Sequence, residues 1–316
     1  MSNRIDYLDI AKGLGIFLIV LGHNNIPIAL YDWIYSFHVP LFFIISGYLL
    51  KNQTLGETIV KGFRHLLLPV FVTILVTVIV LALLFYREGA WKGPSVSHWI
   101  TELILMNGKE GVCGMWFVIA LFWGKLWYCL IKKLEDWWIL LIGSLLFILG
   151  YYCRMNFHLP FHFDNGMSVL FYLFVGMQIS RYDILKYDTN WIVIIFSLFF
   201  LSIASFSPIN LFEYWFRFGV WSVLTSVVLC LSLLFVIKRF CNHDSFIKKI
   251  FVFAGQNTLL ILCMHGILHT WQVHRVLDVF PTTCFAVMEC ILLVLAVPVL
   301  NKVPCVYRLF HGGKNK

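Results

Sequence analysis

Apolar residues occur in long runs from residue 10 to residue 300, with only short polar stretches between them. A run of about 20 apolar residues can cross the hydrocarbon core of a bilayer as an α-helix. The runs predict ten helices, near residues 8–24, 38–50, 66–86, 112–131, 137–152, 166–180, 191–206, 215–237, 250–271 and 280–300. The expected fold is therefore all-α, a polytopic membrane protein with about ten transmembrane helices and a single membrane-embedded domain over residues 1–316.

The second run, at residues 38–50, is the shortest of the ten. Pro40 suits the first turn of a helix, where a missing N–H removes no hydrogen bond. Ser46 and Gly47 are small enough to let a neighbouring helix approach closely. We expect this helix to be buried among the others.

Composition supports a membrane location. Hydrophobic residues make up 60% of the chain and charged residues only 13%, against about 25% charged in a typical soluble protein. So little charge cannot cover a soluble surface. The nine cysteines follow no metal or redox spacing and fit a role as small apolar side chains.

The basic residues predict the orientation. With the N-terminus in the cytoplasm, sixteen of the 24 Lys and Arg residues fall on the cytoplasmic side and six on the outer side. Cytoplasmic loops of membrane proteins carry such an excess. Both termini are therefore expected in the cytoplasm, and the net charge of +8 reflects topology instead of nucleic-acid binding. The early charges Asp6, Asp9 and Lys12 argue against a cleavable signal peptide.

Ionisable groups inside a span are costly unless they are paired or face a wet cavity, so each is a functional candidate. Asp9, Lys12 and His23 share one face of the first helix, and Lys12 and His23 lie ~16 Å apart along its axis. One interpretation is a polar track from the cytoplasmic mouth to a histidine near the outer third of the bilayer. The alternative is an interfacial Asp9–Lys12 ion pair with His23 at the helix end.

Other histidines follow. His38 lies at the start of the second run, and Thr258, His265 and His269 share a face of the ninth, at steps of seven and four. Each histidine alone fits a structural role in a polar pocket, but several together favour a site. Zinc sites combine histidines with nearby cysteine or carboxylate ligands, and the sequence places few of these close to the histidines. We therefore expect no metal.

Further candidates have simpler alternatives. Lys61 and Arg64, one helical turn apart, would suit a nucleotide or pyrophosphate, or serve only as cytoplasmic anchors. Trp116 could line a ligand route or be an interfacial aromatic. Asp164 could support a substrate or cap the sixth helix.

Together these residues resemble the acyltransferase 3 family of membrane acyltransferases, and in particular its fucose 4-O-acetylase-like branch. The most specific signal is Lys12 followed after ten residues by His23, similar to the basic residue and histidine of the family's first helix. The segment from Phe37-His38 to Ser46-Gly47 resembles the family's aromatic-rich second helix. Further similar segments are Lys61-Gly-Phe-Arg64, Met115-Trp116, the Asp164 segment, and Asn257-Thr258 through His265.

The sequence departs from the family pattern in two ways. Lysine stands at positions 12 and 61, where many members carry arginine, and lysine lacks the two-pronged geometry of a guanidinium. After Trp116 the chain also lacks the glutamate of another branch.

The resemblance implies transfer of an acyl group, usually acetyl, from cytoplasmic acetyl-CoA or another acyl-CoA to a hydroxyl of a cell-surface carbohydrate, glycolipid or related acceptor. His23 is the expected general base, because an imidazole can take a hydroxyl proton near neutral pH. Asp9 and Lys12 would tune the path to His23. Lys61, Arg64 and Trp116 would bind the donor, and His38, Ser46, Asp164, Asn257 and His265 would bind substrate or support the site.

The expected location is the cytoplasmic membrane of a bacterium. Two other functions remain open from the sequence. Ten helices with polar groups at depth also describe a transporter or flippase of a solute or glycan intermediate, although no inverted repeat is visible. A membrane sensor that kept the fold without the activity is the third reading, against which the presence of Lys12 and His23 argues.

Overall fold

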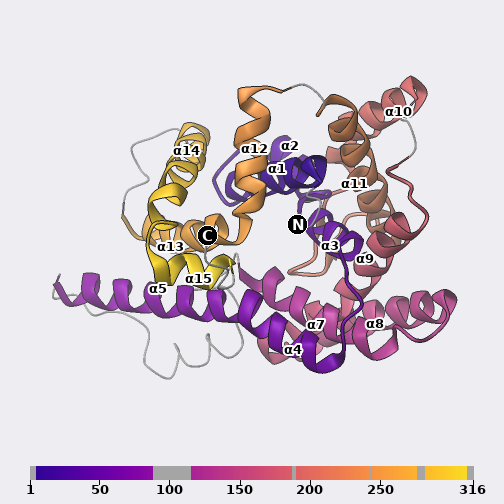
Figure 1. Ribbon diagram of the computed structural model, residues 1–316, viewed down its shortest axis with the longest axis horizontal. Helices are drawn as coiled ribbons and strands as arrows, with labels where there is room; N and C mark the ends of the chain where they lie inside the picture. The colour runs from indigo at the N-terminus through magenta and orange to yellow at the C-terminus, as the bar shows by residue number, and fades with distance from the viewer. Residues whose placement is uncertain (1–4, 88–114, 187–189, 242–243, 276–281, 312–316) are drawn as a thin grey trace.

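The computed structural model describes residues 5–87, 115–186, 190–241, 244–275 and 282–311, and these are almost entirely helical (Figure 1). The α-helices are α1 (Asp6–Gly22), α2 (Ile28–Tyr35), α3 (His38–Tyr48), α4 (Leu55–Gly62), α5 (Leu68–Arg87), α7 (Trp116–Ile131), α8 (Asp136–Asn156), α9 (Phe163–Arg181), α10 (Trp191–Ser202), α11 (Val220–Phe240), α12 (Phe246–Gln256), α13 (Thr258–Arg275), α14 (Thr282–Leu300) and α15 (Pro304–His311). A π-helix, η1 (Phe63–Leu67), joins α4 to α5, and 3-10 turns η3 (Pro160–His162) and η4 (Ala204–Phe206) precede α9 and follow α10. The expected all-α fold is confirmed.

The only strands among the described residues are β1 (Ile209–Asn210) and β2 (Trp215–Phe216). They pair antiparallel, with Ile209 opposite Phe216 and Asn210 opposite Trp215. We call residues 209–216 the hairpin. β2 occupies the place where the sequence predicted the start of a helix at residue 215.

Five stretches of described helix are long and apolar enough to cross a membrane: Ile28–Tyr48, Leu55–Thr77, Asp136–Asn156, Val220–Phe240 and Thr283–Leu300. A sixth is possible if the bent pair of α12 and α13 counts as one span. The chain is thus a multi-pass membrane protein, whereas the count of ten transmembrane helices stays a prediction. α7 and α10 are shorter apolar helices.

The structure differs from the predicted helices in three places. The expected loop at 51–65 contains α4, which begins at a capping box in which Thr54 Oγ1 accepts the Glu57 N–H (3.2 Å) and Glu57 Oε2 accepts the Thr54 N–H (3.0 Å). α2 forms before the predicted second helix. The predicted helix 250–271 is broken at Asn257, where α12 and α13 meet at 79°.

Close helix packing places the core. A Cβ on Gly47 of α3 would overlap the Leu173 carbonyl oxygen of α9, so these two backbones touch. A Cβ on Gly255 of α12 would likewise overlap the Asp9 carbonyl oxygen of α1. Small residues permit such approach in membrane helix pairs. The expected burial of the second predicted helix is confirmed, because nine of the eleven residues of α3 are buried.

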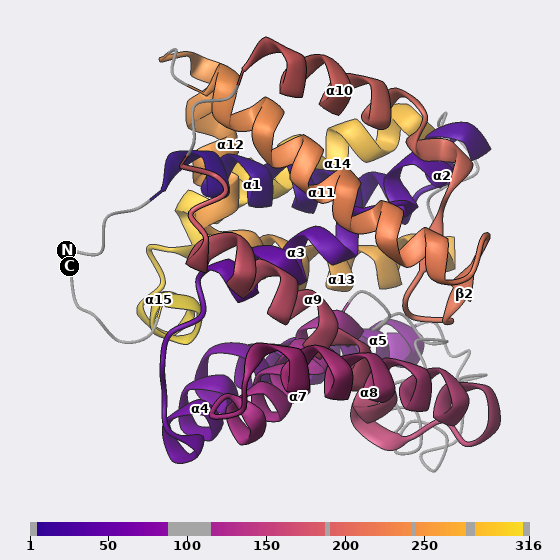
Figure 2. The ribbon, with the colours of Figure 1, turned by 90° about the vertical axis from the view of Figure 1, so that its right-hand side faces the viewer.

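Seen from the side, α1, α3, α11 and α13 run along one direction (Figure 2). α4 and α15 lie towards one end of this bundle, and α2 and β2 lie at the other (Figure 2). The start of α1 is at the same end as α15. The assignment of that end to the cytoplasm remains a prediction from the distribution of Lys and Arg.

Candidate functional site

Three histidine rings meet where the end of α1 lies against α13. His23 is the C-terminal cap of α1. Its ring centroid lies 5.3 Å from that of His265 and 5.8 Å from that of His269, and the last two rings are 5.6 Å apart. The step of four residues on α13 places His265 and His269 on one face, as the sequence predicted.

Glu289 of α14 completes this cluster. Its Oε1 lies 2.6 Å from Nδ1 of His265, and both residues are only 1% exposed. Asn24 donates a hydrogen bond from Nδ2 to the other carboxylate oxygen, at 3.3 Å. A carboxylate accepts from Nδ1–H, so neutral His265 keeps its lone pair on Nε2. That Nε2 atom is buried and has no hydrogen-bond partner among the described residues.

His23 and His38 are held in matching tautomers by their own helices. Nδ1 of His23 lies 2.8 Å from the carbonyl oxygen of Ile19, and Nδ1 of His38 lies 2.8 Å from that of Ile34. A carbonyl only accepts hydrogen bonds, so Nδ1 carries the proton in each neutral ring. The lone pair of both histidines is therefore on Nε2, the atom that could take a proton from a ligand.

A cavity of about 210 Å³ opens beside these two histidines, and we call it the histidine cavity. His23, His38 and Tyr35 line one part, Trp116 and Phe117 of α7 line another, and hairpin residues 209–213 complete it. His265 does not line it. An apolar wall with a few fixed polar groups is typical of small-molecule sites.

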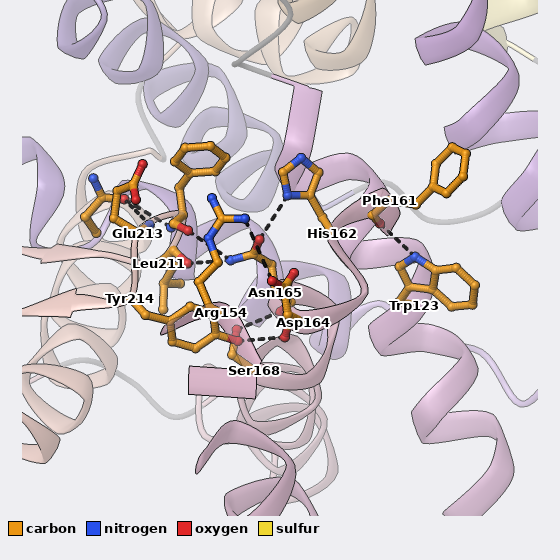
Figure 3. A network of polar contacts seen from close by, with 12 residues as sticks. Trp123, Arg154, Phe161, His162, Asp164, Asn165, Ser168, Leu211, Glu213 and Tyr214 are labelled. Atoms are coloured by element: carbon orange, nitrogen blue, oxygen red, sulfur yellow. Dashed lines mark hydrogen bonds and ion pairs between the residues drawn. The ribbon is translucent and has the colours of Figure 1, made fainter. Parts of the chain in front are cut away.

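The hairpin is held over the histidine cavity by a buried polar network (Figure 3). Asn165 of α9 donates from Nδ2 to the carbonyl oxygens of Leu211 (2.7 Å) and Phe212 (3.3 Å). Tyr214 donates its hydroxyl proton to the Asp164 carbonyl oxygen at 2.7 Å. The guanidinium of Arg154 lies 4.6 Å above the Phe212 ring. These contacts fix the backbone of the turn.

The same network contains a buried ion pair. Arg154 of α8 and Asp164 of α9 are 4% and 0% exposed, and their charged groups lie 3.8 Å apart. Asp164 Oδ1 also accepts the Asn165 N–H at 2.8 Å. Asp164 thus supports the loop that forms one wall of the site, and it does not line the cavity itself.

A second cavity, of about 370 Å³, lies among α3, α4, η1 and α7, and we call it the lysine cavity. Its described lining includes Lys51, Lys61, Lys125, Lys132 and His65, and no acidic residue. Such a concentration of positive charge favours an anionic ligand.

Two of these lysines differ in their surroundings. Lys132 donates to Asn52 Oδ1 at 2.7 Å and to the Gln53 carbonyl oxygen. Lys125 is partly buried in the middle of α7 and makes no ion pair with any described residue. A cation at such depth is expected to face a wet cavity or an anion. Lys125 is therefore a candidate contact for an anion in the lysine cavity.

The two cavities lie at opposite ends of the same helix pair. On α3, Pro40 lines the histidine cavity and Ser46 the lysine cavity, a separation of ~9 Å along the axis. On α7, Phe117 and Phe122 stand in the same relation, ~7.5 Å apart. A ligand longer than this could contact both cavities at once.

Comparison with known proteins decides the family. The model of the acyltransferase 3 family, described as an acyltransferase domain, matches residues 5–300. The chain belongs to this family. No curated protein and no solved structure matches it.

Within this acyltransferase 3 domain, several predicted site residues come together. His23, His38 and Trp116 line the histidine cavity, and His265 contacts His23 from behind. Lys61 and Ser46 line the lysine cavity. Trp116, expected to line the route of the donor's acyl group, lies in the histidine cavity and not with Lys61.

Other predicted residues lie elsewhere. Arg64 is exposed on η1 and lines neither cavity, whereas its neighbour His65 lines the lysine cavity. Asp9 and Lys12 pair at 2.6 Å, and Gln256 Nε2 lies 3.5 Å from Asp9. This is the ion pair that the alternative interpretation describes, and neither residue lines a described cavity.

Asn257 occupies the break between α12 and α13. Its Nδ2 donates to the Phe253 carbonyl oxygen at 2.8 Å, and its Oδ1 accepts from Asn301 at 3.1 Å. The side chain therefore stabilises a helix junction of the acyltransferase 3 domain, away from both cavities.

Sequence reasoning missed three residues of this domain: Glu289, Arg154 and Lys125. Each is an ionisable residue in or beside an apolar run, the signal that drew attention to His23. Arg154 falls between the predicted helices 137–152 and 166–180, whereas it lies in the last turn of α8 and is buried. Lys125 and Glu289 fall inside the predicted helices 112–131 and 280–300. Among the described residues, no group of three or more His, Cys, Asp or Glu is arranged to hold a metal ion.

Proposed function

We propose that this membrane acyltransferase is an O-acyltransferase that moves an acyl group, usually acetyl, from cytoplasmic acyl-CoA to a hydroxyl of a cell-surface carbohydrate or related acceptor. The observation that carries the proposal is the pair of cavities along α3 and α7. One is lined by lysines and the other by histidines with lone pairs on Nε2. The lysine cavity can thus bind the negative charges of a donor, while proton transfer occurs in the histidine cavity. A long donor with its charges at one end and its acyl group at the other fits this separation.

The lysine cavity suits the donor. The phosphates of coenzyme A are multiply charged, and Lys61, Lys125 and Lys132 provide cations in the cavity lining. Lys61 also pairs with the exposed Glu57, at 3.6 Å, whereas Lys125 and Lys132 make no ion pair with a described residue. The pantetheine arm of CoA is long and mostly uncharged, so it can bridge the ~9 Å of helix between the two cavities. The thioester would then lie beside His23 while the phosphates stay with the lysines.

The histidine cavity suits the transfer step. His23 Nε2 takes the proton of the acceptor hydroxyl, and the oxygen attacks the thioester carbonyl carbon. The tetrahedral intermediate collapses with cleavage of the carbon–sulfur bond. The CoA thiolate takes the proton from the His23 imidazolium and leaves as free CoA. We assign the base role to His23 because it lines the cavity, whereas His265 is buried behind it.

Glu289 and His265 act as positioning residues in this proposal. The carboxylate fixes the His265 ring, and that ring packs edge-on against His23. A fixed neighbour keeps the base in one orientation, which matters because small displacements of a catalytic group slow proton transfer.

The first test measures CoA release by the purified protein in nanodiscs. Acetyl-CoA is supplied with extracts of candidate surface glycans, and free CoA is quantified by mass spectrometry, because the chain's nine cysteines would react with a thiol reagent. We expect acceptor-dependent CoA release that falls by at least about 100-fold in His23→Ala. His158→Asn, at an exposed position where φ is +48°, is the matched control.

Donor binding is tested separately. Lys125→Met should raise the Kd for CoA by about 10-fold or more, since it removes a partly buried cation from the lysine cavity. Lys133→Met, exposed and outside the cavity, should leave Kd unchanged. A wild-type protein that neither binds nor consumes any acyl-CoA would contradict the proposal and favour the transporter reading.

A further inference from the structure

A third cavity adjoins the histidine cavity at the end of the bundle that carries α2 and β2 (Figure 2). Its volume is about 350 Å³, and we call it the tyrosine groove. It shares Tyr35, Ile209, Asn210 and Glu213 with the histidine cavity. The two spaces therefore share a wall, and a molecule in the groove lies beside the cavity that contains His23.

Aromatic rings form much of the groove. Tyr31 and Tyr35 are one turn apart on α2 and stack with ring centroids 3.9 Å apart at 23°. Trp215 of β2 lines the same groove and is 50% exposed. The Arg217 guanidinium lies 5.9 Å from the centroid of the Trp215 ring, over one face of it. The half-exposed ring and the two stacked tyrosines still give the groove flat apolar surface for a ligand.

Polar groups occur at the boundary with the histidine cavity. Asn210 Oδ1 accepts the N–H groups of Phe212 (3.0 Å) and Glu213 (3.2 Å), so the amide side chain is held in place while its Nδ2 can donate elsewhere. The Glu213 side chain is exposed and makes no ion pair with any described residue. A donor and a carboxylate thus stand together where the two cavities meet.

The groove is built on fixed elements. Arg217, next to β2, pairs with Asp32 of α2 at 3.1 Å and so links the two sides. Trp33 Nε1 donates to the Leu201 carbonyl oxygen at 2.7 Å, which ties α2 to the end of α10. Asn165 holds the turn of the hairpin from the other side. A groove held in this way is formed before a ligand arrives, which lowers the cost of binding.

We propose that the tyrosine groove is an acceptor subsite that binds an uncharged pyranose ring and presents one of its hydroxyls to His23. A pyranose has an apolar C–H face, which packs on aromatic rings, and a rim of hydroxyls, which bond to carboxylates and amides. Glu213 accepts from hydroxyls and repels carboxylates and phosphates, so sugars with an anionic group bind less well. The inference rests on the proposed function, since it supplies the acceptor for that reaction.

The test uses saturation-transfer NMR on the protein in nanodiscs, with methyl glucopyranoside, methyl galactopyranoside and methyl fucopyranoside as probes and methyl glucuronide as the anionic comparison. We expect at least one neutral glycoside to bind more tightly than the glucuronide. Trp215→Ala should weaken binding by about 3- to 10-fold, the effect expected for loss of one aromatic contact. Trp221→Ala, an equally large change at an exposed site on α11, should not.

Glu213→Gln gives a second, nearly isosteric probe at an exposed position. It should weaken the neutral glycosides and reduce the discrimination against the glucuronide. Equal signals in the wild type, Trp215→Ala and Glu213→Gln would overturn the proposal. CoA binding is recorded on the same samples, so an inactive donor site and a groove without sugar affinity are distinguished as separate failures.

Discussion

Glu289 fixes which ring nitrogen of His265 carries the proton. An imidazole alone can carry its proton on either nitrogen, but His265 faces a carboxylate at 2.6 Å and is thereby limited to the tautomer with Nδ1 protonated. Both groups are 1% exposed, so water does not compete for this contact. A buried carboxylate of this kind is retained only when its partners satisfy it, and here Asn24 provides the second hydrogen bond.

We predict that Glu289→Gln lowers kcat by about 10- to 100-fold, the range found for residues that orient a reactive group. The glutamine keeps the shape but loses the charge that fixes His265. The KM for acyl-CoA should stay within about twofold, because the lysine cavity is untouched. Steady-state kinetics on purified protein measures both. An equal loss in Glu135→Gln, an exposed site on the other side of the domain, would contradict the assignment.

Single residues were predictable where helical spacing alone decides the geometry. His265 and His269 share a face because they are four residues apart, and the structure places their rings 5.6 Å apart. Glu289 could not be linked to His265 in this way, since the two lie on different helices and meet only through tertiary packing. Its signal was a lone carboxylate in an apolar run, which indicates function without naming a partner.

At the scale of elements, the hairpin depends on a charge pair that it does not contain. Arg154 and Asp164 join α8 to α9, and Arg154 also covers the Phe212 ring. Removing one partner leaves the other charge buried and uncompensated. Replacing both with apolar residues removes that cost.

Thermal unfolding in detergent should therefore give a non-additive result. We predict that Arg154→Met lowers stability by about 3–5 kcal/mol and that Arg154→Met with Asp164→Leu recovers a large part of the loss. Asp136→Asn breaks the exposed pair with Arg181, 2.5 Å long, and should change the unfolding temperature little. Additive losses in the double variant would show that the pair does not act as a unit.

Helix contact gives a second prediction at this scale. Gly255→Ala places a methyl group against the Asp9 carbonyl oxygen, so α1 and α12 must separate. We expect a loss of about 1–3 kcal/mol and a lower unfolding temperature. Gly56→Ala on α4 meets no atom within 4 Å and should be neutral or slightly stabilising. The opposite order of the two variants would disprove the close contact.

The positions of most elements could be predicted, and their interruptions could not. Apolar runs located α8 to within a few residues, since a long hydrophobic stretch has few alternatives to a helix in a bilayer. The break at Asn257 was missed because the polar segment Gly255–Thr258 is short and long apolar stretches flank it on both sides. The sequence signal for the start of α4 is a capping box, Thr54 followed three residues later by Glu57. This short signal lies in a polar stretch between two apolar runs, so no helix was predicted there.

At the scale of the whole molecule, the charged cavity and the histidine cavity are separated along α3 and α7. The lysine cavity lies at one end of α3 and α7, and the histidine cavity and tyrosine groove lie at the other. The proposed reaction therefore needs the orientation predicted from the basic residues, with the lysine cavity towards the cytoplasm and its supply of acyl-CoA. The opposite orientation would separate the donor site from its ligand.

Two exposed cysteines test this orientation. Cys284 is in the first turn of α14 and Cys305 in the first turn of α15, beyond the far end of α14. We predict that a membrane-impermeant maleimide applied to intact cells labels a protein retaining only Cys284. A protein retaining only Cys305 should be labelled only after the cells have been permeabilised. The reverse pattern would invert the topology and remove the donor site from the cytoplasm.

The ends of two helices distinguish His23 from His38. The C-terminal end of a helix carries a partial negative charge and the N-terminal end a partial positive one, each about half an elementary charge. His23 caps the C-terminus of α1, whereas His38 is the first residue of α3. The imidazolium that forms when a hydroxyl gives up its proton is therefore favoured by the dipole at His23 and opposed by the dipole at His38. Although the two histidines share a tautomer and a cavity, we therefore expect His23 to take the proton in the proposed reaction and His38 to remain a neutral hydrogen-bonding group.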